Sequence, residues 1–138
     1  MVLTRNIPLT TGAAGDLIDI TDRLSDLVSK SGVSSGTVTV FVPGSTGGLT
    51  TIEYEPGLKK DFPELMERLI PSGKSYQHDQ TWHDGNGFSH LRAAVIGPDI
   101  TIPFVGGKLT LGTWQQVVFC EFDNRERRRD LVVQIVGE

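Results

Sequence analysis

A chain of 138 residues with 38% hydrophobic and 22% charged side chains has the composition of one globular domain, which we expect to span residues 1–138. The formal net charge of −4 opposes a diffuse nucleic-acid-binding surface, and no segment approaches the roughly 18 apolar residues of a membrane span. The only cysteine, Cys120, cannot form a disulfide within the chain, and the N-terminal residues lack a secretory signal. We therefore expect a cytoplasmic protein with neither nucleic acid nor membrane as a partner.

Two segments have the residue pattern of helices. Thr21 is a suitable N-cap for the segment 22–32, in which Leu24, Leu27 and Val28 share one face and Gly32 has the position of a C-cap glycine. The second helix is expected over about residues 57–69, before Pro71. Its apolar stripe consists of Phe62, Leu65, Met66 and Leu69, and we interpret it as a core-packing face.

Most of the remaining chain has the pattern of strands, because it alternates or is rich in β-branched residues. The expected strands are 37–42, 49–55, 90–97, 99–105, 108–114, 115–122 and 130–137. Gly106-Gly107 predicts a two-residue hairpin, and residues 123–129 are interpreted as the solvated tip of a final hairpin or a subunit contact. Because the order lacks regular βαβ alternation, we expect an α+β fold with two main helices and a large mixed, mostly antiparallel sheet.

Two familiar binding loops are excluded by single residues. Gly73-Lys74-Ser75 ends like a phosphate-binding P-loop, but the glycine required at position 68 is Arg68. A calcium loop counted from Asp79 places Asp84 where a glycine is needed.

All three histidines lie between residues 76 and 93. If the flanking segments are extended, Tyr76 and His78 face one side of the first, and His90 and Arg92 face one side of the second. The turn at residues 84–87, which includes Asn86, would then bring both histidines into one pocket.

Imidazole suits both proton transfer near neutral pH and metal ligation. Asp84 and Glu53 could orient an imidazole or complete a metal site. The alternative is that the histidines belong to a structural polar network.

Residues 44–48, Gly-Ser-Thr-Gly-Gly, follow an expected strand. The backbone N–H groups and the hydroxyls of Ser45 and Thr46 could form an anion-binding nest, or the segment could be only a tight turn. Arg92 and Lys108 are candidate phosphate partners, although Lys108 at a hairpin has the pattern of an exposed side chain.

The segment DGNGFSHLRAAVIGPDITIPFVGGKLTLGTWQQVVFCEFD, residues 84–123, with the basic turn and VVQIVGE that follow, resembles the YjbQ family, whose members are labelled secondary thiamine-phosphate synthase enzyme. Residues 42–61 fit the family's strand–loop–strand–Glu–helix element, and the resemblance covers about residues 37–138. It implies an α+β domain that assembles as a homotrimer and has a pocket lined by shared histidines.

The resemblance also implies particular site residues. The Tyr-x-His and Ser/Ala-His elements correspond to Tyr76, His78 and His90, and the glutamate after the Thr-rich strand corresponds to Glu53. The Gly-Thr-Trp-Gln element corresponds to Gly112, Thr113, Trp114 and Gln115. Many members carry a histidine where this chain has Gly44, and some carry one where it has Phe88. These departures argue against a three-histidine metal site, unless His83, beside Trp82, substitutes as a ligand.

The expected function is that of a secondary thiamine-phosphate synthase, which joins a pyrimidine-methyl diphosphate to a thiazole phosphate. We expect catalysis by His78, His90, Glu53 and Asp84, and a divalent metal, magnesium or zinc, held by His78 and His90. The expected contacts to a phosphorylated small-molecule substrate are Ser45, Thr46, Tyr76, Asn86, Arg92, Thr113, Trp114 and Gln115. The alternatives are a metal-assisted hydrolase or phosphate-ester enzyme and a non-enzymatic trimer that binds a metal or small ligand.

Overall fold

The computed structural model describes all residues from 1 to 138. The strands are β1 (Val2–Thr11), β2 (Leu17–Asp19), β3 (Gly36–Phe41), β4 (Gly47–Ile52), β5 (Asp99–Val105), β6 (Lys108–Leu109), β7 (Gln116–Glu121) and β8 (Arg127–Gly137). The helices are α1 (Thr21–Ser29), α2 (Pro56–Leu69), α3 (Gln77–Trp82) and α4 (Gly87–Ile96).

The strands form two ladders, one of five strands in the order β1-β8-β3-β5-β6 and one of three in the order β2-β7-β4. The α+β class with predominantly antiparallel strands is confirmed. The expectation of some parallel pairing is wrong, since every strand pair is antiparallel. The Gly106-Gly107 hairpin is also confirmed, and both glycines have positive φ, as a tight two-residue turn requires.

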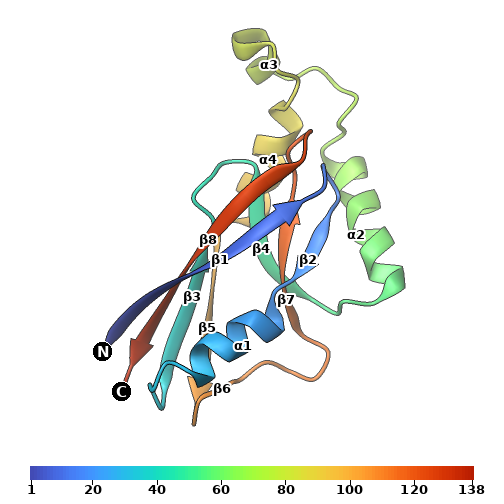
Figure 1. Cartoon of the computed structure of the whole chain (residues 1–138). Coiled ribbons are helices and arrows are strands. Elements are labelled where there is room, and N and C mark those ends of the chain that lie inside the picture. Colours follow the sequence, from blue (N-terminus) through green and yellow to red (C-terminus); the bar gives the residue numbers. More distant parts are fainter.

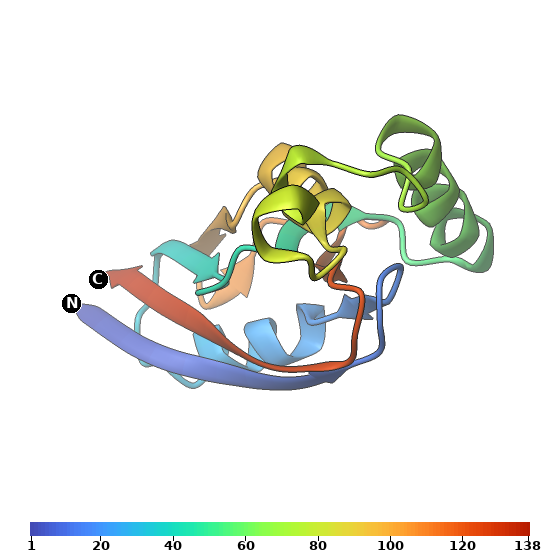
Figure 2. The same ribbon diagram turned by 90° about the horizontal axis from the view of Figure 1, so that it is seen from above.

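Two apolar cores separate three layers (Figures 1 and 2). The larger core lies between the inner face of the five-stranded sheet and a middle layer of α1 and the three-stranded sheet. The smaller core lies between the other face of the three-stranded sheet and the helices α2 and α4. Strand β7 serves both cores, because Val117 and Phe119 face the first while Val118 and Cys120 face the second.

The two expected helices are confirmed, with one correction at a cap. Helix α2 begins at Pro56, one residue before the expected start, and Glu55 accepts hydrogen bonds from two backbone N–H groups of its first turn. Thr21 is the first residue of α1 rather than its N-cap, and Asp19 accepts hydrogen bonds from both its N–H and its hydroxyl. The N-cap residue itself is Ile20, which makes no side-chain cap hydrogen bond, so Asp19, one residue earlier, satisfies the N–H of the first helical residue.

The expectation of extended structure on both sides of the turn at residues 84–87 is wrong, because both flanking segments are helical. In α4 the buried residues Phe88, Ser89, Arg92 and Ala93 recur at helical spacing, and the helix packs against β4 and, through Arg92, against the end of α2. Helix α3 buries no residue and is held by its caps. The chain therefore has two helices beyond those expected.

The expected final hairpin is also wrong. Strand β7 pairs with β2 and β4, whereas β8 pairs with β1 and β3, so residues 122–126 connect the two ladders. Two other expected strands are shorter than their patterns, since β4 ends at Ile52 and β6 comprises only two residues.

None of the helices has both the length and the apolar composition needed to cross a lipid bilayer.

Candidate active site

The imidazoles of His78 on α3 and His90 on α4 lie side by side, with ring centroids 4.4 Å apart. Their predicted convergence is confirmed, although helices rather than strands bring them together. The His78 side chain is 29% exposed, so solvent reaches the pair. Nε2 of His78 lies 3.0 Å from the side-chain amide of Asn86 and 3.5 Å from a carboxylate oxygen of Asp84. His78 therefore has polar partners, as a proton-transfer group requires, and is not packed in an apolar core.

The side-chain amide of Asn86 orients His78. With its nitrogen facing these partners, the amide donates to Nε2 of His78 at 3.0 Å and to the Asp84 carboxylate at 2.8 Å. Nε2 is then the acceptor of the neutral ring, so the proton of neutral His78 is on Nδ1. The predicted neighbourhood of His78, Asp84 and Asn86 is thus present in the structure.

Asp79 holds α3 against α4. Its carboxylate accepts hydrogen bonds from the N–H groups of Tyr76 and Gly87, each at 3.0 Å. These two hydrogen bonds keep the pKa of Asp79 below its ordinary value, and the bond from the Tyr76 N–H has the larger effect. The Tyr76 hydroxyl donates to the carbonyl of Pro71, so Tyr76 fixes the segment that carries His78.

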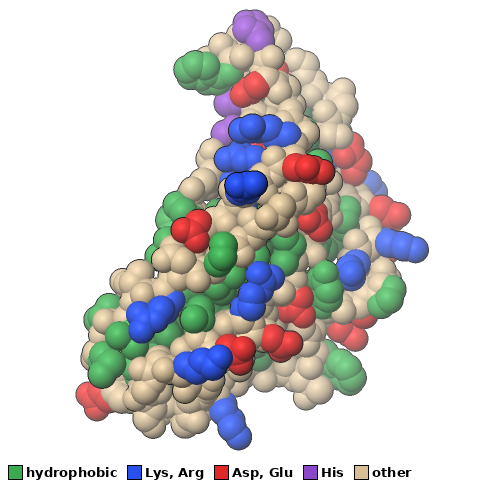
Figure 3. Space-filling model, viewed as in Figure 1, with side chains coloured by type: hydrophobic (Ala, Val, Ile, Leu, Met, Phe, Trp, Pro, Cys, Tyr) green, Lys and Arg blue, Asp and Glu red, His purple; other side chains and the backbone are tan.

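A polar hollow of about 480 Å³ lies beside the histidine pair, and no hydrophobic side chain lines it. Its lining combines the 44–46 loop, the α3–α4 turn, His90 on α4, the connector that follows β7, and the start of β8. The lining residues are Gly44, Ser45, Thr46, Asp84, Asn86, His90, Asp123, Asn124, Arg125, Arg127 and Arg129. Figure 3 shows basic side chains gathered below the histidines at this end of the molecule.

Arg129 lies at the base of the hollow in a buried ion pair. Its Nε and Nη2 donate to the two carboxylate oxygens of Glu121 at 2.9 and 2.6 Å, and Nη2 also donates to Thr46. The hydroxyl of Thr11 donates to the same carboxylate at 2.6 Å. Only 4% of the Arg129 side chain and none of the Glu121 side chain is exposed, so the guanidinium is held in one orientation.

Asp123 forms the second ion pair of the hollow, with Arg127. Burial raises the pKa of Asp123, but hydrogen bonds from Arg127, the Asn124 N–H and Thr46 outweigh this effect and hold the pKa below its ordinary value. Asp123 is therefore ionised at neutral pH. Asn124 also donates to the carbonyl of Asp84, which ties the connector to the α3–α4 turn.

The expectation that Arg92 shares a side with His90 and contacts phosphate is wrong. Residues two apart in a helix are separated by roughly 200° around its axis, so the two side chains diverge. The guanidinium of Arg92 is buried and donates to the carbonyl of Ile70 and to Glu67. Arg92 thus joins α4 to the end of α2.

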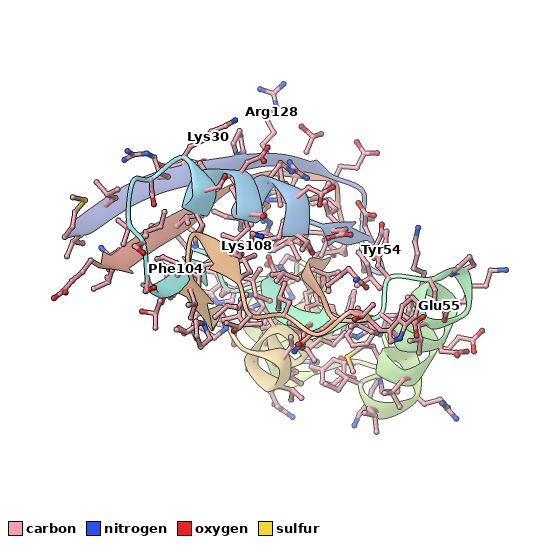
Figure 4. All side chains as sticks on the ribbon, turned by 90° about the horizontal axis from the view of Figure 1, so that it is seen from below. Lys30, Tyr54, Glu55, Phe104, Lys108 and Arg128 are labelled. Atoms are coloured by element: carbon pink, nitrogen blue, oxygen red, sulfur yellow. The ribbon has the colours of Figure 1, made fainter.

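Glu53, Thr113 and Trp114 line a different hollow, together with Tyr54, Glu55 and residues of α1. The side-chain amide of Gln115 donates a hydrogen bond to the hydroxyl of Thr51, close to β5. Figure 4 labels Tyr54 and Glu55 at the start of α2 and Lys108 on β6, and Figure 1 places β6 at the opposite end of the molecule from α3. Within one chain, the histidine set and the Glu53–Trp114 set are therefore separate, and neither Glu53 nor Lys108 lines the hollow beside the imidazoles.

The donor set does not fit the expected metal. No three side chains among the histidines, carboxylates and Cys120 are arranged to ligate one ion, and Nε2 of His78 is already engaged by Asn86. His83 is the C-cap of α3, has left-handed backbone geometry, and does not line the hollow.

Arg125 on the connector and Arg127 and Arg129 at the start of β8 are site residues that the sequence patterns did not reveal. Alternate residues of β8 point to the same side of the sheet, so Arg129 is on the same side as Leu131, Val133 and Ile135, which face the core. An arginine at a core-facing position requires a buried partner, and Glu121 within an apolar strand is that partner. This alternation was the signal that could have identified them.

Comparison with known proteins gives one consistent result. The family model described as UPF0047 protein YjbQ-like matches residues 5–138. A UPF0047 protein of Archaeoglobus fulgidus is 40% identical over 126 residues, which cover 91% of this chain and 96% of that protein. Bacillus subtilis YugU is 28% identical over 98% of this chain and 100% of its own length.

Solved structures agree with the sequence matches. A crystal structure of a YbjQ-like protein from Sulfolobus solfataricus has a TM-score of 0.93 at 33% identity, covering 100% of this chain and 99% of that one. One from Clostridium acetobutylicum, of the YjbQ/UPF0047 family, has a TM-score of 0.85 at 34% identity, covering 96% of this chain and 99% of that one. The chain belongs to the YjbQ (UPF0047) family.

Proposed function

We propose that this protein is an enzyme that holds a phosphate group of a small substrate in the arginine-lined hollow and moves a proton with the His78–His90 pair. The observation that carries the proposal is that His90, whose ring lies 4.4 Å from that of His78, lines a hollow that has three arginines and no apolar side chain. Arginine donors suit phosphate oxygens, and imidazole titrates near neutral pH.

The first reaction to test is thiamine-phosphate synthesis. The thiazole nitrogen attacks the methylene carbon of the pyrimidine diphosphate, a C–N bond forms, and the C–O bond breaks with its electron pair on the departing diphosphate. The fixed guanidinium groups of Arg127 and Arg129 would hold the phosphate of the thiazole substrate, which positions its nitrogen for the attack. A protonated imidazole at His90, at the edge of this hollow, would protonate an oxygen of the departing diphosphate next to it. The polar lining favours the phosphate part of a substrate over its rings.

The test compares His90→Gln with His83→Gln as a matched control, because His83 is the C-cap of α3 and lies outside the hollow. Formation of thiamine phosphate from the two substrates is followed by chromatography. Loss of a general acid lowers the rate by roughly 10²–10⁴. His90→Gln should show this loss, and His83→Gln should keep the wild-type rate.

The outcomes separate the candidate functions. Equal rates in wild type and His90→Gln would exclude catalysis by the pair. Saturable phosphate binding without turnover of these substrates or of phosphate esters would identify a passive binding protein instead.

We also propose that the chain assembles as a homotrimer. The outer face of the five-stranded sheet supports this, because no helix covers it and Val2, Phe41, Val105 and Val136 are exposed on it. Sedimentation equilibrium should give the mass of three 15.1-kDa chains. Phe41→Lys with Val136→Lys should shift it toward one chain, while Leu69→Lys, an exposed apolar position on α2, should not.

A reducing, cytoplasmic compartment remains our proposal for its location. The buried free thiol of Cys120 is compatible with such a compartment. Fractionation of cells that produce the native protein tests it.

A further inference from the structure

One edge of the Arg129 guanidinium is unused within the chain. Nε and Nη2 are bonded to Glu121 and Thr46, whereas Nη1 donates to no protein atom. Nη1 lies beside Gly44, since a Cβ built on Gly44 would come within 3.0 Å of it. Both residues line the hollow, so the bare Cα of Gly44 leaves this edge accessible.

Arg129 cannot turn away from an added side chain at position 44. Its carboxylate partner is fully buried, and rotating the guanidinium would break bonds to both Glu121 and Thr46. The backbone of Gly44 has no positive φ, so alanine is compatible with its conformation. An alanine methyl group there would therefore press against Nη1 at 3.0 Å, closer than ordinary van der Waals contact, and would block it.

The charge of the hollow limits the ligand. Arg127 and Arg129 are already paired with Asp123 and Glu121, and Arg125 alone among the three arginines has no ion pair. The Asp84 carboxylate also lines the hollow, so it is the third carboxylate near the arginines, after Asp123 and Glu121. Arginines and carboxylates thus balance, and a phosphomonoester, with a charge of about −1.5 to −2 at pH 7, is easier to accommodate than a more highly charged diphosphate.

We propose that Gly44 determines access to the site: its missing side chain opens Nη1 of Arg129 to one phosphate group, and the hollow selects a phosphomonoester over a metal-free diphosphate. This inference rests on the proposed phosphate-binding function. In the transferase reaction the hollow then holds the thiazole phosphate, and the diphosphate lies outside it.

The experiment is calorimetric titration of metal-free protein with methyl phosphate and, separately, with inorganic pyrophosphate. It uses wild type, Gly44→Ala and the control Gly73→Ala, where an added Cβ meets nothing within 4 Å. We expect wild type to bind methyl phosphate more tightly than pyrophosphate. Gly44→Ala should lose roughly tenfold or more in affinity, the effect of one lost hydrogen bond to a charged group, with a Tm no higher than that of wild type. Gly73→Ala should match wild type.

Each other outcome overturns a stated part. If wild type binds neither ligand, both this inference and the proposed function are wrong. If wild type binds methyl phosphate and Gly44→Ala binds it equally well, only the role of Gly44 is wrong. Pyrophosphate binding at least as tight as that of methyl phosphate contradicts the ligand class. If the alanine variant does not fold, the guanidinium NMR signals of wild-type Arg129 must shift on adding methyl phosphate, and unchanged signals overturn the inference.

Discussion

The buried pair of Glu121 and Arg129 gives the sharpest prediction about how the site is built. Replacing Glu121 with glutamine preserves the side-chain volume but leaves the Arg129 guanidinium, 4% exposed, without a counter-charge. Removing one partner of a buried pair costs roughly 3–5 kcal/mol, because the remaining charge is desolvated and uncompensated. Glutamine retains one acceptor, so we expect about 3 kcal/mol.

That loss is measurable against the total stability. The free energy of unfolding of a domain of this size is about 5–15 kcal/mol, so the variant should still fold but should unfold at a lower temperature than wild type. At about 4 °C per kcal/mol, the Tm falls by roughly 12 °C. Urea unfolding is best followed by circular dichroism, because Trp82 and Trp114 are 69% and 72% exposed and report poorly on burial.

Two further variants make the test specific. Glu121→Leu combined with Arg129→Met removes both charges and should be more stable than Glu121→Gln alone, since an apolar pair avoids the unpaired charge. Arg128→Met is the matched control, because Arg128 is exposed and projects away from the sheet (Figure 4), and its stability should stay within about 0.5 kcal/mol of wild type. If Glu121→Gln unfolds at the same urea concentration as wild type, the reasoning about this ion pair is refuted.

Three further predictions follow from single groups. Asp79→Ala removes the carboxylate that joins α3 to α4, so backbone amides 77–83 should exchange with deuterium faster than in wild type while those of β8 do not; equal exchange throughout would contradict the role of Asp79. Because the pKa of Asp123 is lower in the folded than in the unfolded state, its carboxylate stabilises the fold above its unfolded pKa of about 3.9, and this stabilisation is lost as pH falls through the lower folded-state value. Thermal melts at decreasing pH should therefore show a smaller fall in Tm for Asp123→Asn than for wild type. An equal fall in Tm for the two proteins would contradict the role of Asp123. Burial raises the pKa of Cys120 to about 12, so a thiol reagent at pH 8 should label it only after unfolding, and rapid labelling of the native protein would be inconsistent with the core.

Local patterns in the sequence predict much of this fold. The apolar stripe of α2 and the hairpin at Gly106-Gly107 follow from spacing and from glycine backbone geometry. The partners of β7 and β8 do not, because strands that are adjacent in the chain commonly pair with each other. The buried ion pair of Glu121 and Arg129 connects the end of β7, in one ladder, to the start of β8, in the other. Interpreting residues 123–129 as a solvated hairpin tip is incompatible with this buried contact.

The candidate site was predicted in part, and for a reason that was partly wrong. The clustering of His78 and His90 in one short segment indicated their contact, and the structure confirms it. The apolar segment 90–97 was interpreted as a strand, although Phe88, Arg92 and Ala93 already had helical spacing. That error placed Arg92 beside the histidines. The sequence also does not reveal the distance between Glu53 and the histidine pair, which depends on tertiary packing.

The most direct test of the central claim is an NMR titration of the native protein with inorganic phosphate, observing the imidazole signals and the backbone amides. We predict saturable shifts at His78, His90 and residues 44–46, with the signals of Trp114 unchanged. Shifts confined to the hollow that contains Glu53 and Trp114, or no saturable shift at either histidine, would contradict the account.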